Sequence, residues 1–535
     1  TNMVEAHRQL PEDIQRKIAP LRASSSIEHS FGAVMDVDKR QALQAGLELM
    51  PRFVTEFLLA KARQDNATLS LHEVRDRIRQ FSIDADRKEE FKSRLMRHGQ
   101  AVLIGLLEVE ARLERRVHLG RIAQLAPMEI AVPDSLIEKH TELLYGGLWG
   151  SCLLTYDERA KPQVLASQFE PYQLTRPDMA AFREARAQFT FEEWLDLLIT
   201  SAGYRPEGFS SLRHKLLLLA RLVPLVQGNV NIVEFGPRGT GKSYLLRNLS
   251  PRVHLLAGAR ATPATLLYDL NRNQVGIVGR KKVVVFDEIG ATSFPDRSLV
   301  AALKTYMQDG LIERSGKSLT SDCSFMWTGN LETDADGMPR RDYQHLLEEL
   351  PRELCDVAIA DRLHGFLPGW ELPKISDDVL ADGVGFLSDY FGEVLCHLRG
   401  DLTFQDWLKT FVVLDVATTR DATAIHRAPA KRHALGLRQQ QLADIVGHRG
   451  AEHRSQRLEV AGGWTGSVGL GIHGSVIVVR RWRGRPCDEA HVFGVRYSVN
   501  PWNHMISTKS PLSVRSSSCS AARKASLPSL ADRIS

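Results

Sequence analysis

A glycine-rich segment near the middle of the chain restricts its fold more than any other stretch. Gly236-Pro-Arg-Gly-Thr-Gly-Lys-Ser243 has the spacing G-x-x-x-x-G-K-S. The β-branched run 231–235 comes directly before it, and 244–249 follows as a helix-forming run. In such a strand–loop–helix turn, backbone N–H groups curl around phosphate oxygens and the helix N-terminus adds positive potential. We therefore predict an α/β fold of the P-loop NTPase class for this part of the chain.

Each position of this loop has an expected part in binding ATP and Mg²⁺. Lys242 is expected to reach the β- and γ-phosphates, and the Ser243 hydroxyl is expected to ligate Mg²⁺. The predicted nucleotide-binding residues are Gly236, Pro237, Arg238, Gly239, Thr240, Gly241, Lys242, Ser243 and Tyr244.

Two further strand-like runs end in polar side chains. Residues 283–286 are four apolar residues between charges, which is typical of a strand buried on both faces. Asp287 and Glu288 follow, where open α/β sheets place their ligands. We expect Asp287 to hold Mg²⁺ through water and Glu288 to polarise the attacking water. Asn330 ends the next run, 323–328, where its amide could orient that water; an ordinary turn is the alternative.

Composition excludes several other classes of protein. The chain has 535 residues, 43% hydrophobic and 25% charged, which indicates several globular domains rather than a fibre or a wholly disordered chain. Its longest apolar stretch, 216–226, is interrupted by Arg221 and is about half a membrane span. The N-terminus has no apolar leader, so we expect a cytoplasmic protein without membrane contact. Six cysteines without C-x-x-C spacing favour reduced thiols.

The periodicity of apolar residues changes along the chain. Helical spacing before residue 100 predicts helices at 71–81 and 86–96. Alternation at 108–113 and a strand-like run at 147–156 indicate a small β-rich unit. A capping box at Thr190 and Glu193 begins a helix, and a further helix over 212–223 is expected to end at Pro224.

The end of the chain differs in charge. Residues 428–535 carry 16 Lys and Arg against 6 Asp and Glu, and Arg outnumbers Lys 13 to 3. So abrupt a shift marks a boundary. Two explanations stay open: a divergent C-terminal domain, or a shifted reading frame that leaves an atypical, disordered tail. Resequencing the locus distinguishes them.

Longer segments resemble a known family. The order of P-loop, Asp-Glu strand, Asn strand end and Asp361-Arg362 is similar to that of AAA+ ATPases. The segments GLWGSCLLTYDE, FTFEEWLDLLITSAGY, RLVPLVQGNVNIVEFGPRGTGKSYLLRNLSP, GLIERSGK and DRLHGFLPGWELPK resemble the BrxL family, the Lon-like AAA+ proteins of BREX bacteriophage-resistance systems. The resemblance extends over residues 8–427, and the Lon-protease-like domain that it implies next is not recognisable. The predicted units are a helical region 1–100, a small β-rich unit 101–190, an AAA+ core 191–375, a partial lid 376–427 and the basic tail 428–535.

The resemblance implies a function and further site residues. It implies an ATP-hydrolysing ring, a hexamer or stacked hexamers, that binds double-stranded DNA and acts on phage DNA with other BREX proteins. Lys242, Asp287, Glu288 and Asn330 then take catalytic roles. Arg362 is the candidate arginine finger, with a surface pair to Asp361 as the alternative, and Arg420 falls where a sensor 2 residue would lie.

Cationic residues are the candidates for DNA contact. Arg314 and Lys317 flank a turn where ring ATPases can carry a pore hairpin, with a solvated turn as the alternative. Arg112 lies in the alternating run, and Arg115 and Arg116 follow it, although charges at such spacing are usually a solvated face. Two other functions stay open: a Lon-like unfoldase or protease acting on proteins, and a slow-turnover, nucleotide-dependent assembly scaffold.

Overall fold

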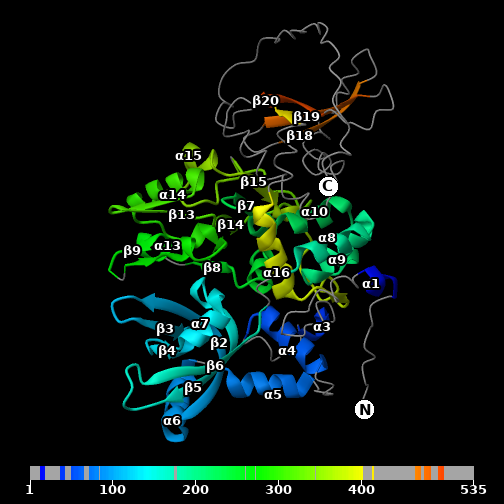
Figure 1. Ribbon diagram of the computed structural model, residues 1–535. Coiled ribbons are helices and arrows are strands. Elements are labelled where there is room, and N and C mark those ends of the chain that lie inside the picture. Colours follow the sequence, from blue (N-terminus) through cyan, green and yellow to red (C-terminus); the bar gives the residue numbers. More distant parts are fainter. Residues whose placement is uncertain are drawn as a thin grey trace, which may run out of the picture.

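Figure 1 shows the computed structural model of the chain. It describes residues 12–17, 37–42, 50–64, 71–83, 85–173, 177–258, 261–271, 273–343 and 345–401, together with strands at 412–414, 464–470, 475–482 and 492–498. Within these ranges, no helix has the length and apolar character needed to cross a membrane. The cysteines among them are free thiols, as the spacing predicted: Cys152, Cys323, Cys355 and Cys396.

A five-stranded sheet forms the centre of the ATPase region. Its order is β15-β7-β14-β11-β8, and all neighbouring strands run parallel. Parallel sheets are covered on both faces, so their strands are continuous apolar runs, as 283–286 is. The predicted α/β class is confirmed for this region. The strands are β7 (Asn231–Gly236), β8 (Val253–Ala257), β11 (Val283–Asp287), β14 (Ser324–Asn330) and β15 (Gly365–Pro368).

Helices cover both faces of this sheet (Figure 1). Alternate residues of β11 point to opposite faces: Val283 and Val285 join one hydrophobic cluster, whereas Val284 and Phe286 join the other. The first face is covered by α8 (Met179–Ala187), α9 (Phe191–Ser201), α10 (Leu212–Ala220), α11 (Val223–Val226), α12 (Lys242–Leu249) and α16 (Ser388–His397), and the second by α13 (Pro263–Leu266), α14 (Arg297–Asp309) and α15 (Val357–Ala360). The capping box at Thr190 and Glu193 is present at the start of α9.

The long apolar run is two helices rather than the single helix that was expected. α10 ends at Ala220, and Pro224 lies in the first turn of α11 instead of ending a helix. Proline is tolerated there because the first N–H groups of a helix have no partner within it. The break between the helices falls at Arg221, which is fully buried.

The predicted β-rich unit is a closed barrel. Its strand order is β2-β3-β4-β6-β5, with β5 paired back to β2, and β4 and β6 run parallel. The barrel ends at residue 171, which differs from the expected limit of 190, because α8 packs through Phe182 into the ATPase core. The elements are β2 (Gln100–Arg112), β3 (Val117–Ile122), β4 (Ile130–Val132), α7 (Asp134–Lys139), β5 (Leu148–Tyr156) and β6 (Val164–Pro171).

The N-terminal helices are not a separate region, in contrast to the sequence expectation. β1 (Val37–Asp38) pairs antiparallel with β16 (Val384–Gly385), which ties them to the ATPase region. On the other side, Phe53 and Phe57 of α4 pack against the barrel residues Trp149 and Tyr172, the latter just past β6. The helix expected at 71–81 is confirmed as α5, and the one expected at 86–96 begins two residues later, as α6. The helices are α1 (Glu12–Lys17), α3 (Lys39–Ala42), α4 (Arg52–Gln64), α5 (Leu71–Phe81) and α6 (Lys88–His98).

The segment predicted as a partial lid is core as far as the structure describes it. α16 packs in the first hydrophobic cluster through Phe391, Val394 and Leu395. In the tail, β18 (Trp464–Leu470), β19 (Ser475–Trp482) and β20 (Val492–Ser498) form a sheet with β17 (Val412–Leu414), so these segments are regular strands rather than disordered chain.

Candidate nucleotide site

The P-loop joins β7 to α12 with the backbone shape that its glycines permit. Gly239 and Gly241 have φ values of +86° and +70°, in the left-handed region that side chains rarely adopt. Gly241 is also the N-cap of α12, so unpaired N–H groups and the positive end of the helix face the loop. A Cβ on Gly239 would meet nothing within 4 Å, which shows that this side of the loop is open. The loop therefore fits a phosphate group.

Lys242 lies folded over this loop. Its ammonium donates to the carbonyls of Gly236 at 3.0 Å and Pro237 at 2.8 Å, and to Oδ1 of Asn330 at 3.3 Å. Burial lowers the pKa of Lys242, and the nearby Glu234 carboxylate opposes that shift. These acceptors hold the ammonium at the mouth of the loop, where phosphate oxygens could replace them.

The Asp287 carboxylate is positioned by three donors. Its Oδ1 accepts from the Ser243 hydroxyl, from Thr328 Oγ1 at 2.8 Å and from the Glu288 N–H at 3.2 Å. A hydroxyl beside a carboxylate is a donor set that suits Mg²⁺, which takes few protein ligands and keeps several waters. Among the residues that the structure describes, no cluster of three His, Cys, Asp or Glu could hold a metal alone. The remaining ligands would therefore come from nucleotide and water.

Glu288 and Asn330 complete this edge of the sheet. β14 lies between β7 and β11, and Asn330 pairs in register with Gly236. Glu288 directly follows β11, is exposed and has a φ of +50°. The structure therefore brings together the loop, both carboxylates and the Asn330 amide, as parallel strand ends require.

The other loop residues also have defined places. The Gly239 carbonyl accepts from the Ile375 N–H at 2.7 Å, and Arg238 is exposed. Thr240 is buried, and its carbonyl accepts from Arg221. The Tyr244 ring lies 6.0 Å from the Arg52 guanidinium, so it packs toward the N-terminal helices.

Arg362 is not near the P-loop of its own chain. Its guanidinium donates to the Lys304 carbonyl at 2.8 Å and to Gln308 at 2.7 Å, both on α14. Its own carbonyl accepts from Asn231 at 3.0 Å, at the end of β7 opposite Gly236. A six-residue strand separates the two ends by about 17 Å. Arg420 lies outside the described residues.

The candidate DNA contacts lie on β-hairpins. Arg314 and Lys317 are paired at the end of the hairpin of β12 (Leu311–Arg314) and β13 (Lys317–Thr320). Lys317 is exposed, whereas Arg314 donates to the carbonyl of Tyr268 in β9 (Tyr268–Asp269). β9 in turn pairs with β10 (Gln274–Val275).

The barrel hairpin of β2 and β3 adjoins this group. Gln274 of β10 donates to Glu110 at 2.5 Å. Arg112 pairs with Glu110 at 3.2 Å and Arg115 with Glu129 at 3.9 Å, whereas Arg116 is an exposed turn residue. The three hairpins lie along one side of the molecule, where β3, β9 and β13 are labelled in Figure 1.

Sequence reasoning missed three residues of the site. Thr328 orients Asp287, and the buried pair of Arg221 and Glu234 lies beneath the loop. Arg221 had a visible signal, since it interrupts an apolar run. Nothing in the sequence distinguished Thr328 from its neighbours.

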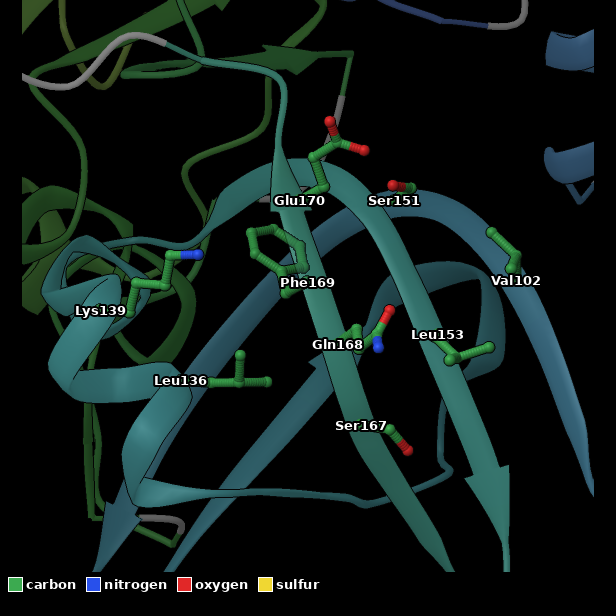
Figure 2. Close-up of a pocket in the computed structure, with 9 residues that line it drawn as sticks. All are labelled: Val102, Leu136, Lys139, Ser151, Leu153, Ser167, Gln168, Phe169 and Glu170. Atoms are coloured by element: carbon green, nitrogen blue, oxygen red, sulfur yellow. The ribbon is translucent and has the colours of Figure 1, made fainter. Parts of the chain in front are cut away.

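A shallow groove lies elsewhere, on the outside of the barrel. Its volume is about 370 Å³. Figure 2 shows it between α7 and strands β2, β5 and β6. The lining residues are Val102, Leu136, Lys139, Ser151, Leu153, Ser167, Gln168, Phe169 and Glu170.

Two family models match the chain. The ATPase domain of Lon-like protease BrxL-like proteins matches residues 164–431, and the N-terminal domain of the BREX system Lon protease-like protein BrxL matches residues 32–156. The chain belongs to the BrxL family. The resemblance drawn from the sequence is thereby confirmed, and the P-loop site lies within an ATPase domain.

Two curated BrxL-family relatives show how much of the protein this match covers. The Lon-like protease BrxL of Escherichia coli O9:H4 (strain HS) is 30% identical over 411 residues, and that of Bacillus cereus (strain H3081.97) is 30% identical over 410. Each alignment covers 75% of this chain but only 58% and 60% of the relatives. Among solved structures, a full-length MCM homologue from Methanopyrus kandleri aligns with a TM-score of 0.35 and 13% identity, over 63% of this chain and 73% of that one.

Proposed function

We propose that this BrxL-family protein is a Mg²⁺-dependent ATP hydrolase that assembles into a ring and acts on double-stranded DNA. In this proposal it works in the cytoplasm with other BREX proteins against phage DNA. One observation carries the proposal: two hydrogen bonds join the P-loop to the neighbouring strand ends at one edge of the sheet. Lys242 donates to Asn330, and Ser243 donates to Asp287.

The proposed chemistry divides among these side chains. Lys242 binds the β- and γ-phosphates in place of its carbonyl partners, and Asn330 orients the attacking water. Glu288, which is exposed beside the site, accepts a proton from that water. Ser243 and Asp287 would hold Mg²⁺, which when bound would neutralise charge on the phosphate oxygens.

The three hairpins are the proposed DNA surface. Each is linked to the next by a hydrogen bond, from Gln274 to Glu110 and from Arg314 to the carbonyl of Tyr268. Exposed Arg116 and Lys317 are cations at two of the hairpin turns, where they can meet phosphates. A hairpin of the barrel and a hairpin of the ATPase core thus share one surface.

The barrel topology supports a nucleic-acid role. A five-stranded Greek-key barrel with a helix between its third and fourth strands has the order of an OB-fold. OB-folds bind oligonucleotides with the face of their second and third strands and with the loop between the first and second. In this chain that loop contains Arg115 and Arg116.

Steady-state ATP hydrolysis with and without duplex DNA, at one low salt concentration, tests the proposal. Lys242→Ala serves as the blank. A DNA-stimulated rate that is lost in this variant is the expected result. A rate that ignores DNA but rises with unfolded protein would favour the unfoldase alternative that the relatives' name suggests. ATP-dependent assembly without hydrolysis would favour the scaffold.

A further inference from the structure

Arg221 is a charged residue in an apolar environment with no role in the chemistry described above. It is fully buried and lies between α10 and α11. Its partner, Glu234, is also fully buried and is the fourth residue of the P-loop strand β7. The pair therefore lies directly beneath the loop.

The guanidinium makes two kinds of contact. It binds the Glu234 carboxylate in bidentate fashion, from Nε at 3.0 Å and from Nη2 at 2.5 Å. Its third nitrogen, Nη1, donates to the main-chain carbonyl of Thr240 at 3.0 Å. Arginine can make these contacts at once because its planar fork carries five donors.

The contact with Thr240 determines the direction of the next N–H group. In a trans peptide the C=O and the following N–H point to opposite sides. Because the Thr240 carbonyl points inward to Arg221, the Gly241 N–H points outward to the open side of the loop. Gly241 is the N-cap of α12, so this N–H is among the first donors that a phosphate would meet.

We propose that Arg221 is a positioning residue that holds the P-loop in its phosphate-binding shape, with Glu234 as its anchor. This inference rests on the proposed nucleotide binding. A gain in folding stability does not explain this ion pair well, since buried ion pairs often contribute no more to stability than apolar residues of similar volume. The third contact, to the loop, is what an apolar replacement cannot reproduce.

The neighbourhood leaves little freedom for the loop to adjust. A Cβ on Gly241 would lie 3.0 Å from the Tyr204 hydroxyl and from Ile375. Tyr204 is fully buried, and burial raises its pKa to about 12. The loop is thus supported from below by Arg221 and confined by Tyr204.

The double variant Arg221→Met/Glu234→Met tests the proposal, because removing both charges leaves none unpaired. Arg252→Met/Glu393→Met is the matched control. Arg252 also binds a glutamate, at 2.9 Å, and donates to a main-chain carbonyl, that of Tyr145 at 3.2 Å, but this carbonyl belongs to the barrel. Thermal unfolding and titration with a fluorescent ATP analogue are measured for both variants and the wild type.

We expect the Arg221 double variant to unfold within a few degrees of the wild type and to bind the analogue about 10- to 100-fold more weakly, the effect of one hydrogen bond to a charged group. The control should bind normally. Wild-type affinity in the Arg221 double variant would overturn the inference alone, whereas a wild-type protein that binds no nucleotide would overturn the proposed function as well.

Arg221→Lys covers the case in which the double variant does not fold. A lysine can bind Glu234 or the Thr240 carbonyl, but its single nitrogen cannot reproduce the fork. Weakened binding with an unchanged kcat at saturating ATP is expected. Unchanged binding in a folded Arg221→Lys protein would contradict a positioning role.

Discussion

Side chains at the nucleotide site are held by hydrogen bonds to one another. Thr328 and Ser243 both donate to Asp287, and Lys242 reaches Asn330 across the strand ends. Glu288 differs because it is exposed. A carboxylate in that position can accept a proton without first breaking a buried hydrogen bond.

Replacing Glu288 by Gln should therefore separate binding from hydrolysis. We expect kcat to fall by about 10²- to 10⁴-fold, the usual contribution of a general base, while nucleotide affinity changes little. Single-turnover hydrolysis and equilibrium titration measure the two quantities. Glu353→Gln, at another exposed glutamate, is the control; a Glu288→Gln protein that hydrolyses ATP at the wild-type rate would exclude the assigned role.

The hairpin of β12 and β13 is an element with a defined turn. Ser315 and Gly316 both have positive φ, +47° and +77°, as in the type I′ turn that suits the twist of paired strands. Lys317 is thus presented on a short, stiff support. For a DNA-binding hairpin, this rigidity reduces the entropy lost on contact.

Lys317→Glu should weaken DNA binding mainly through the phosphate backbone. We expect the slope of the logarithm of the DNA-binding constant against the logarithm of the salt concentration to become less steep by about one for each hairpin engaged. Basal ATP hydrolysis should be preserved. Fluorescence anisotropy with duplex DNA at several salt concentrations gives the slope. Lys139→Glu, an exposed change on α7, is the control, and an equal effect of both variants would indicate a general charge effect.

The contact between α3, α4 and α16 is built from buried polar groups. Lys39 donates to Glu56 at 2.8 Å, and Glu56 also binds Arg52 at 3.2 Å and accepts from the Ser388 N–H at 2.8 Å. Burial lowers the pKa of Lys39 to about 8, although Glu56 and, more weakly, Asp389 oppose this shift and Arg52 adds to it. Glu56 keeps two partners if Lys39 is removed.

This shift predicts a pH-dependent stability. An unfolded lysine titrates near pH 10.4, so between about pH 8 and pH 10 the unfolded chain binds more protons than the folded one. The free energy of unfolding therefore gains a contribution that rises with pH in this window. The free energy of unfolding of the wild type and of Lys39→Met is measured with urea across this window. The wild-type value should rise with pH relative to that of the variant, whereas a constant difference between the two would mean that Lys39 keeps an ordinary pKa.

Features formed by residues close together in the chain could be predicted from the sequence, whereas those that depend on distant residues could not. The loop at 236–243 was predictable because strand, glycines and helix are adjacent in the chain, and Asp287 and Asn330 followed from the rule that parallel strands end at one edge. The barrel was visible only as β-rich, since its closure pairs Ile130 with Val164. The position of the Arg362 side chain could not be predicted from the sequence, because its partner Lys304 lies on a helix far away in the chain.

At the scale of the whole molecule, the position of Arg362 bears on how subunits would have to be arranged. Since it lies at the end of β7 opposite its own P-loop, an arginine-finger role requires a ring in which each subunit completes the next site. Arg362→Ala and Lys242→Ala should each be inactive. Mixing them in equal amounts should restore about a quarter of the wild-type rate, because random assembly then forms intact interfaces at that frequency.

The mixing experiment distinguishes this role from a purely structural one. If Arg362 only supports α14 through the Lys304 carbonyl and Gln308, the mixture should remain as inactive as its components. Subunit exchange is followed in parallel by mass measurement of mixed complexes. ATP hydrolysis by Arg362→Ala alone would exclude both the arginine-finger role and a structural role that hydrolysis requires.

Two contacts between the ATPase core and the barrel use main-chain carbonyls of the barrel. Arg252 donates to the carbonyl of Tyr145, and Lys281 to that of Gly146. Every residue type offers the same carbonyl, so this attachment is indifferent to the side chain at position 145, which is itself exposed. Substitutions at position 145 can therefore change the exposed surface of the barrel without removing this attachment to the ATPase core.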